Sequence, residues 1–284
     1  EIGVTRSMVS RMLTEARNRG IVEIKINHPL QLDHNLEEAI KRRFEIDSVV
    51  VVTVRDNNQG KHLEKLGKAA ADVLKKYIKS NSVLGIAWGT TISATVDAVE
   101  PIDNLEIKVV QLVGALGAQI VEYDGHALVQ RLAIKLNGES YFINAPYICQ
   151  TQEIAQSMME TKGIKETIEL GAKLDVALLG IGTTETKYSS YFLSGLLPEG
   201  EIEKLRKLGV VGDIASNYFK IDGKPYRDSF MNRLVTIKES DLFRTPIRIG
   251  VAGGPGKVQA IIGALNTKII NVFVTDSITA RSIL

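Results

Sequence analysis

The sequence predicts an α/β fold, with a Rossmann-like, mostly parallel sheet and helices on both faces. Two observations carry this prediction. Along residues 48–284, short apolar runs alternate with longer segments whose apolar residues recur at the three-and-four spacing of a helix. The valine run at residues 48–54 is also typical of a strand buried on both faces. Strands and helices that alternate in this way form parallel sheets covered by helices.

Each expected element follows from this alternation in chain order. The expected strands are residues 48–54, 83–87, 107–113, 141–143, 175–180, 247–252 and 269–274. The expected helices are residues 63–78, 92–99, 128–136, 153–170 with a break at Gly163, 202–208, 257–265 and 277–284. Residues 188–228 are richer in glycine, tyrosine and polar residues. We expect a loop or lid there, with residues 214–221 less regular.

Residues 5–24, ahead of this alternation, have the pattern of a DNA-recognition helix followed by a wing strand at residues 21–26. Thr5 or Ser7 can cap the helix, and Gly20 can end it. One helical face is apolar and consists of Met8, Val9, Met12, Leu13 and Ala16. The opposite face carries hydroxyl and guanidinium groups, from Arg6, Ser7, Ser10, Arg11, Thr14 and Arg17.

This polar face suits base edges and phosphates in a major groove. Arginine offers a bidentate fork to guanine, and short hydroxyl side chains bond phosphate oxygens. We therefore predict that operator DNA is contacted by Arg6, Ser7, Ser10 and Arg11. A surface helix with solvated arginines is the alternative. Residues 1–4 resemble the turn inside a helix-turn-helix, so we expect a partial winged helix-turn-helix without its preceding helices.

Three parts are expected along the chain. Residues 1–30 form the partial helix-turn-helix module, with the recognition helix and the wing. Residues 48–284 form one large ligand-binding domain. Between them, residues 31–47 form a linker helix after Pro29, because a second apolar stripe is made by Leu36, Ala39, Ile40 and Phe44.

The composition is that of an ordinary soluble globular protein. Of 284 residues, 44% are hydrophobic and 24% charged, and the formal charge of +2 does not by itself indicate nucleic-acid binding. Cys149 is the single cysteine, which excludes an intramolecular disulfide and a cysteine-based zinc site and fits a reducing cytoplasm. No apolar run approaches the roughly 20 residues that span a bilayer. We expect a cytoplasmic protein without metal or membrane contact.

Three glycine-rich turns follow expected strands and precede helices. Backbone N–H groups at such helix starts bind anions. The first is Gly89-Thr90-Thr91, where two hydroxyls can add to the amide donors, although threonine at a helix start is often only a cap. The second, residues 180–184, includes Gly182. The third, residues 250–257, includes Gly254 and ends at Lys257, which can neutralise a phosphate held by the amides.

None of these turns matches a nucleotide fingerprint. In the phosphate-loop pattern, Val251 stands where a glycine is needed and Val258 where serine or threonine is needed. In the dinucleotide pattern, Glu185 stands in place of the third glycine. We therefore expect no ATP hydrolysis and no cofactor.

Further polar candidates stand elsewhere in the large domain. Asp213 lies in Val-Val-Gly-Asp-Ile and Asp276 in Phe-Val-Thr-Asp-Ser, where a carboxylate can accept sugar hydroxyls. For Asp276, capping of the last helix is an equal alternative. His126 and Trp88 are expected to be structural, and Cys149 a small core residue.

These motifs together resemble the SorC family of bacterial sugar-responsive transcription regulators. The resemblance covers almost the whole chain, including Thr-Arg-Ser-Met-Val-Ser-Arg-Met-Leu, Gly-Ile-Ala-Trp-Gly-Thr-Thr, Leu-Gly-Ile-Gly-Thr, Gly-Asp-Ile, Val-Ala-Gly-Gly-x-x-Lys and Val-Thr-Asp-x-x-Thr-Ala. It implies a homo-oligomer, a dimer or tetramer, whose C-terminal domain binds a phosphorylated sugar as effector. Carried over, phosphate would be held by Gly89, Thr90, Thr91 and Lys257, and the sugar would meet Asp213, Thr183 and Lys187.

An active sugar-phosphate isomerase or deaminase of the same fold is the rival hypothesis. Such chemistry needs a general base beside the carbon acid. Where the deaminases that this fold resembles carry Asp-Gly-His, this chain has Thr184, Glu185 and Thr186. Where such enzymes place paired acids, it has Leu112, Val113, Gly114 and Ala115. We therefore expect a regulator that binds without turnover and not an enzyme. Glu185 is the carboxylate that keeps catalysis open, and a ligand-binding protein without a nucleic-acid role is a third possibility.

Overall fold

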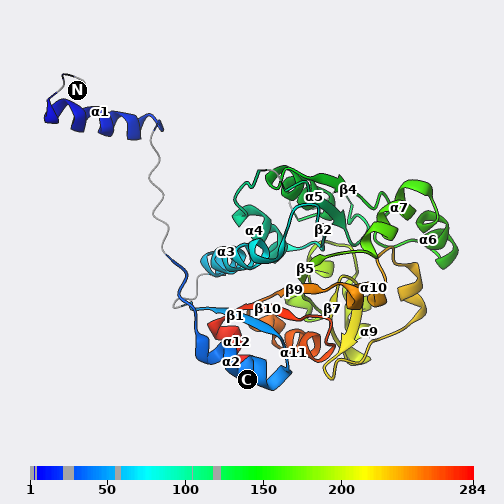
Figure 1. Cartoon of the computed structure of the whole chain (residues 1–284). Coiled ribbons are helices and arrows are strands. Elements are labelled where there is room, and N and C mark those ends of the chain that lie inside the picture. Colours follow the sequence, from blue (N-terminus) through cyan, green and yellow to red (C-terminus); the bar gives the residue numbers. More distant parts are fainter. Residues whose placement is uncertain (1–2, 4, 22–28, 55–58, 104, 118–122) are drawn as a thin grey trace. The chain divides into compact units, whose positions relative to one another are not determined.

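The computed structural model describes residues 3, 5–21, 29–54, 59–103, 105–117 and 123–284 (Figure 1). By compactness the chain divides into two units, Glu1–Leu30 and Gln31–Leu284. Among the described residues, the first unit contains one helix, and the second contains the sheets and the other helices.

The N-terminal unit contains helix α1 (Arg6–Asn18). The Thr5 hydroxyl accepts a hydrogen bond from the Met8 amide at 3.4 Å, so the predicted cap is confirmed. Gly20 has a φ of +69°, and Ile21 N–H donates to the Ala16 carbonyl at 2.8 Å, which ends the helix as expected. Four of the five residues of the predicted apolar face are exposed, namely Met8, Val9, Met12 and Leu13, with Met12 60% exposed. Beyond Ile21, the expected wing strand lies outside the described residues.

The large unit is built on seven strands in the order β1-β10-β9-β5-β2-β3-β4, and all their pairings are parallel. The predicted parallel sheet is therefore confirmed. Its strands are β1 (Ser48–Val52), β2 (Val83–Ile86), β3 (Lys108–Gln111), β4 (Glu139–Tyr141), β5 (Val176–Gly180), β9 (Ile247–Val251) and β10 (Val272–Asp276).

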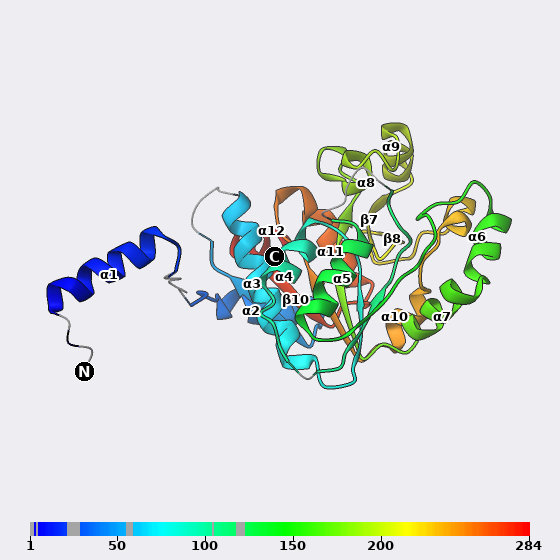
Figure 2. The same cartoon turned by 90° about the horizontal axis from the view of Figure 1, so that it is seen from above.

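Helices connect these strands and cover both faces of the sheet (Figures 1 and 2). The chain crosses the sheet from β1 at one edge through β2 and β3 to β4 at the other edge. It then runs in the opposite direction from β5 through β9 to β10. Because parallel crossovers are right-handed, this reversal places the two sets of helices on opposite faces. The described helices are α2 (His34–Phe44), α3 (Gln59–Tyr77), α4 (Thr90–Ala98), α5 (Gly125–Lys135), α6 (Gln152–Met159), α7 (Lys162–Gly171), α8 (Ser190–Leu193), α9 (Glu199–Lys207), α10 (Glu239–Arg244), α11 (Val258–Asn266) and α12 (Ser277–Ile283), with 3-10 turns η1 (Thr186–Tyr188), η2 (Ser229–Arg233) and η3 (Pro255–Lys257).

The predicted break at Gly163 is wrong by two to three residues. Helix α6 ends at Met159 and α7 starts at Lys162, with Thr161 as its N-terminal cap position. Gly163 lies inside α7, because a glycine is tolerated in a helix and threonine favours a helix start.

A second, antiparallel sheet lies within the segment expected to be irregular. Its order is β6-β7-β8, with β6 (Gly182–Thr183), β7 (Val210–Ile214) and β8 (Asn217–Lys220). The prediction of a less regular stretch at residues 214–221 is therefore wrong. The turn between β7 and β8 consists of Ala215 and Ser216, both at positive φ. Hairpin turns of this kind usually carry Asn-Gly, so the sequence lacked the expected signal.

The edge of the sheet at β1 is covered by the chain that precedes it. Asp33 N–H donates to the Val51 carbonyl and Thr53 N–H to the Gln31 carbonyl. The buried Glu37 of α2 accepts the Val51 amide at 3.0 Å through Oε1 and contacts His34 Nδ1 at 2.7 Å through Oε2. These bonds satisfy the exposed edge of the strand and fix α2 to the sheet.

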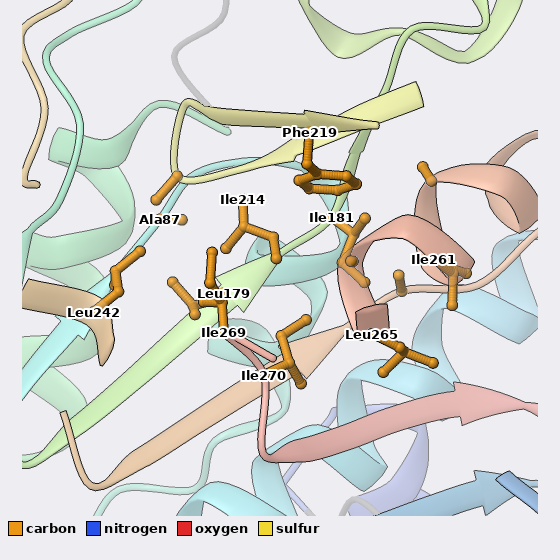
Figure 3. Packing of buried hydrophobic residues seen from close by; sticks show 14 of the residues in the cluster. Ala87, Leu179, Ile181, Ile214, Phe219, Leu242, Ile261, Leu265, Ile269 and Ile270 are labelled. Atoms are coloured by element: carbon orange, nitrogen blue, oxygen red, sulfur yellow. The ribbon is translucent and has the colours of Figure 1, made fainter. Parts of the chain in front are cut away.

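The hydrophobic core joins the two sheets (Figure 3). Leu179 at the end of β5 and Ile181 after it pack in the same cluster as Ile214 and Phe219 of the hairpin. Ile261 of α11 belongs to this cluster too, and all five residues are at most 1% exposed. The hairpin is thus held over the carboxyl end of the parallel sheet.

Substitution of Gly67 in α3 tests the packing of α3 against α4, and Gly163 in α7 provides the control. A Cβ at Gly67 would lie 2.5 Å from the Ala94 carbonyl oxygen, so Gly67→Ala must push the two helices apart. We expect it to destabilise the chain by about 1–3 kcal/mol in urea unfolding. At Gly163 a Cβ meets nothing within 4 Å. Gly163→Ala should therefore stabilise the chain by about 0.5–1 kcal/mol. Equal stability of the two variants would contradict the packing described here.

Candidate ligand-binding site

A small pocket of about 40 Å³ lies where the sheet changes direction. Strands β2 and β5 are neighbours, and the chain leaves them in opposite directions along the sheet. Ligands of open parallel sheets bind beyond the carboxyl ends of strands at such a position. The pocket is lined by Ala87, Trp88, Gly89, Thr90, Thr91 and Ile92 after β2, Gly180, Ile181 and Gly182 after β5, and Ser190, Tyr191, Asp213, Ala215 and Lys257.

The start of α4 forms one wall of this pocket. Gly89 precedes the helix with a φ of +121°, a conformation that residues with a Cβ rarely adopt. No side chain caps the helix, and the first N–H groups of any α-helix have no partner inside it. The amides that follow Gly89 are therefore placed to bind an anion, favoured further by the helix dipole.

The opposite wall carries one group of each charge. Lys257 at the end of η3 donates from Nζ to the Ile181 carbonyl at 2.8 Å, and burial lowers the pKa of its ammonium group. Asp213 of β7 is 5% exposed. Burial raises the pKa of Asp213 to about 6, although hydrogen bonds from Tyr191 and the Ser216 amide and the charge of Lys257 act to lower it. Asp213 and Lys257 form no salt bridge with each other, so both charges face the pocket available to a ligand.

The residues that line the pocket lie in a part of the chain that matches a known family model. Residues 28–284 match the family model described as "Putative sugar-binding domain". The chain belongs to this sugar-binding domain family.

The sugar-binding domain and the segment before it are similar to known regulators over the whole chain. The sorbitol operon regulator of Klebsiella pneumoniae is 26% identical over 286 residues, which cover 100% of this chain and 90% of that protein. The deoxyribonucleoside regulator of Bacillus subtilis is 26% identical over 283 residues, with the same coverage of both chains. The crystal structure of full-length SorC from Klebsiella pneumoniae has a TM-score of 0.86 at 25% identity, covering 99% of this chain and 90% of that one.

These findings confirm the resemblance to the SorC family. The relatives are transcriptional regulators with sugar-binding domains, and they place this chain among regulators of carbohydrate metabolism and not among enzymes. In the described part of the chain, every helix is too short or too polar to cross a bilayer. The same residues contain no group of three or more His, Cys, Asp or Glu side chains placed to hold a metal ion.

Six of the ten predicted effector residues meet in the pocket of the sugar-binding domain. They are Gly89, Thr90, Thr91, Gly182, Asp213 and Lys257. They come from three turns and a hairpin that lie far apart in the sequence, and the reversal of strand order brings these elements together.

Thr183 and Lys187 lie outside this pocket, on a wider groove of about 980 Å³ beside it. The Thr183 hydroxyl donates to the Gly256 carbonyl and accepts the Glu185 amide, both at 3.1 Å, and so ties the loop after β6 to η3. Lys187 Nζ lies 5.7 Å from the centre of the Tyr188 ring. Glu185 also faces the groove and pairs with Arg206 at 3.0 Å.

Gly254 and Asp276 do not line the pocket either. Asp276 accepts the Ile278 and Thr279 amides through Oδ1 and the Thr279 hydroxyl through Oδ2, so it caps α12 as the alternative prediction states. Thr279 Oγ1 in turn accepts the Gly254 amide at 2.7 Å. This chain of hydrogen bonds fixes the turn that carries Lys257. Asp276 therefore supports the pocket without lining it.

Sequence reasoning missed two aromatic residues of the pocket. Trp88 was expected to be structural, yet it lines the pocket directly after β2, a position that could have indicated this role. Tyr191 donates its hydroxyl to Asp213 Oδ2 at 2.8 Å, and its ring meets the Trp88 ring edge-on at 5.1 Å. It lies in the segment expected to be a loop or lid, and no pattern singled it out. His126, by contrast, stacks on Phe142 and contacts Asn144, away from the pocket.

A pair of glycine substitutions tests the close approach of Asp213. A Cβ at Gly182 would lie 1.9 Å from Asp213 Oδ1, whereas a Cβ at Gly180 would lie 3.5 Å from its nearest atom, the Trp88 carbonyl oxygen. Gly182→Ala should therefore displace the carboxylate and weaken ligand binding by more than about tenfold, the equivalent of one lost hydrogen bond to a charged group. Gly180→Ala should bind nearly as the unaltered chain does. Calorimetric titration checks this, and similar affinities for both variants would contradict the geometry.

Proposed function

We propose that the pocket binds a phosphorylated sugar as an effector, without turnover, and that this binding controls a DNA-binding transcriptional regulator. One observation carries the proposal. A partly buried lysine and a buried carboxylate face the uncapped start of α4 at the point where the sheet changes direction. Amide donors and an ammonium group suit a phosphate, and a carboxylate suits sugar hydroxyls.

In this proposal the two ends of the effector use different walls. The phosphate lies against the amides of Thr90 and Thr91 and is neutralised by Lys257. The sugar hydroxyls donate to Asp213, and Trp88 offers an apolar ring beside them. The family match supports a sugar ligand, and the phosphate rests on the charge of the pocket.

The absence of turnover rests on the few acid–base groups in the pocket. Among the described residues that line it, Asp213 is the one carboxylate, and both its neighbouring donors bind the same oxygen. Aldose–ketose isomerisation needs a base and a separate proton shuttle. Glu185, the carboxylate that kept the enzyme hypothesis open, faces the outer groove and is paired with Arg206.

The N-terminal unit supplies the DNA contacts in this proposal. Arg6, Ser7, Ser10 and Arg11 all lie on α1 and are exposed. We further propose that the protein acts in the cytoplasm as a homo-oligomer, a dimer or tetramer, as the resemblance to the SorC family implies. An effector controls DNA affinity only if it favours one of two states. The segment from α8 to β8 reaches from the pocket to the outer groove and is the candidate for the moving part.

A thermal-shift screen with phosphorylated sugars and their unphosphorylated partners tests the proposed effector, followed by a turnover assay on every hit. We expect one phosphosugar to stabilise the chain without forming product. Lys257→Met should weaken this phosphosugar more than about tenfold and its unphosphorylated partner far less, because one charge-assisted contact to phosphate is lost. Equal losses for both ligands would contradict the phosphate assignment, and product formation would favour the enzyme.

Substitution of Arg11 tests the recognition helix. Arg11→Ala should weaken binding to duplexes selected by the unaltered chain by about 5- to 150-fold, since a bidentate contact to guanine is worth roughly 1–3 kcal/mol. Arg19 provides the control, because it is paired with Glu15 at 2.5 Å and lies outside the predicted face. Arg19→Ala should change affinity much less in fluorescence anisotropy. Failure of the unaltered chain to select any duplex would contradict DNA recognition by this unit.

A further inference from the structure

Tyr191 connects residues 188–228, the segment expected to be a loop or lid, to the charged wall of the pocket. It is the buried residue of the short helix α8, with 4% exposure. Its ring packs edge-on against Trp88 at 5.1 Å and stacks on Tyr147 at 5.4 Å. Its hydroxyl donates to Asp213 Oδ2 at 2.8 Å. Tyr191 therefore contacts both an aromatic and a charged residue of the site.

The two oxygens of Asp213 have different surroundings. Oδ2 accepts the Tyr191 hydroxyl and the Ser216 amide, at 2.8 and 3.0 Å. Oδ1 lies against Gly182 and accepts no hydrogen bond from the described residues. With Oδ2 held from one side by two donors, Oδ1 is the oxygen that a ligand can reach.

We propose that Tyr191 is a positioning residue, which holds Asp213 Oδ2 so that Oδ1 stays turned to the pocket. The identity of the group that meets Oδ1, a sugar hydroxyl, rests on the proposed function. The positioning itself rests on the geometry of Tyr191, Asp213 and Gly182 and does not need a ligand.

The groups that face Asp213 determine how its charge responds to the loss of the Tyr191 hydroxyl. They are Tyr191 from α8, the Ser216 amide from the hairpin turn, Lys257 from η3, and the phenols of Tyr147 and Tyr218. Burial raises the pKa of Asp213, and the Tyr191 hydroxyl lowers it. Tyr191→Phe removes that donor and leaves the burial, so the pKa must rise. A protonated Asp213 is a poorer acceptor, so effector binding is lost as pH falls through this pKa, and the variant loses it at higher pH.

Tyr218 provides a matched control within the same cluster. It is buried to 1% exposure, and its hydroxyl contacts the Tyr147 hydroxyl at 3.1 Å. Its hydroxyl makes no hydrogen bond to Asp213. Tyr218→Phe therefore removes a phenol from the same core while it leaves both donors to Oδ2 in place.

Carboxyl-carbon NMR titration of the ligand-free chain tests the proposal, with the Asp213 signal assigned by its loss in Asp213→Asn. We expect a midpoint of about 6 in the unaltered chain. Tyr191→Phe should raise this midpoint by about one unit, a tenfold weaker acid, and Tyr218→Phe should leave it within a few tenths. An unchanged midpoint in Tyr191→Phe, or equal shifts in both variants, would overturn the proposal.

A second titration, on the unaltered chain alone, covers the case in which Tyr191→Phe does not fold. The ring carbon that bears the Tyr191 hydroxyl, assigned by contact with the single tryptophan Trp88, should shift with the Asp213 midpoint. The corresponding Tyr218 carbon should shift less. Movement of neither carbon, or of both equally, would overturn the proposal.

The titrations test the positioning role of Tyr191, and the ligand screen tests the proposed function, so either proposal can be wrong without the other. The expected Asp213 shift in a chain that binds no phosphosugar would keep the positioning role and remove the proposed function. A phosphosugar bound by Tyr191→Phe with unchanged affinity and unchanged pH profile would keep the proposed function and remove the positioning role.

Discussion

Burial of the Asp213 carboxylate at the reversal point of the sheet is the constraint on which the site depends. A buried charge is costly unless neighbouring groups compensate for it. Here the compensation comes from separate elements, namely Tyr191 of α8, the Ser216 amide of the hairpin turn and the charge of Lys257. Each must be held in place, so the small sheet, α8 and η3 are fixed around one side chain.

The alternation of strands and helices was predictable because its causes are local. The valine run of β1 and the periodic apolar residues of α3 and α11 report burial directly in the sequence. The turns with Gly89 and Lys257 were predictable for the same reason, since parallel strands end at one edge of the sheet. The residue types at that edge were therefore sufficient to predict which turns meet at the pocket.

The parts that sequence reasoning missed depend on individual side-chain hydrogen bonds and ring contacts. The hairpin turn at Ala215 and Ser216 has two residues at positive φ without the usual Asn-Gly. Its Ser216 amide is held by Asp213, and Asn217 Nδ2 donates to the carbonyls of Ile214 and Ala215. Likewise, the place of Tyr191 is set by Trp88 and Asp213, more than 20 residues away in each direction. Periodicity carries no record of such contacts.

The segment at residues 31–33, which covers the edge of β1, has a mechanical consequence. Residues 31–33 lie antiparallel to β1 and are bonded to Val51 and Thr53, so the chain enters the large unit as a short extra strand. Tension applied through residue 30 is therefore carried by hydrogen bonds to β1 and passes to its neighbour β10. Asp276, at the end of β10, caps α12 and supports the Gly254 turn. A pull on the N-terminal segment and an anion at the Lys257 turn would thus both act on β10.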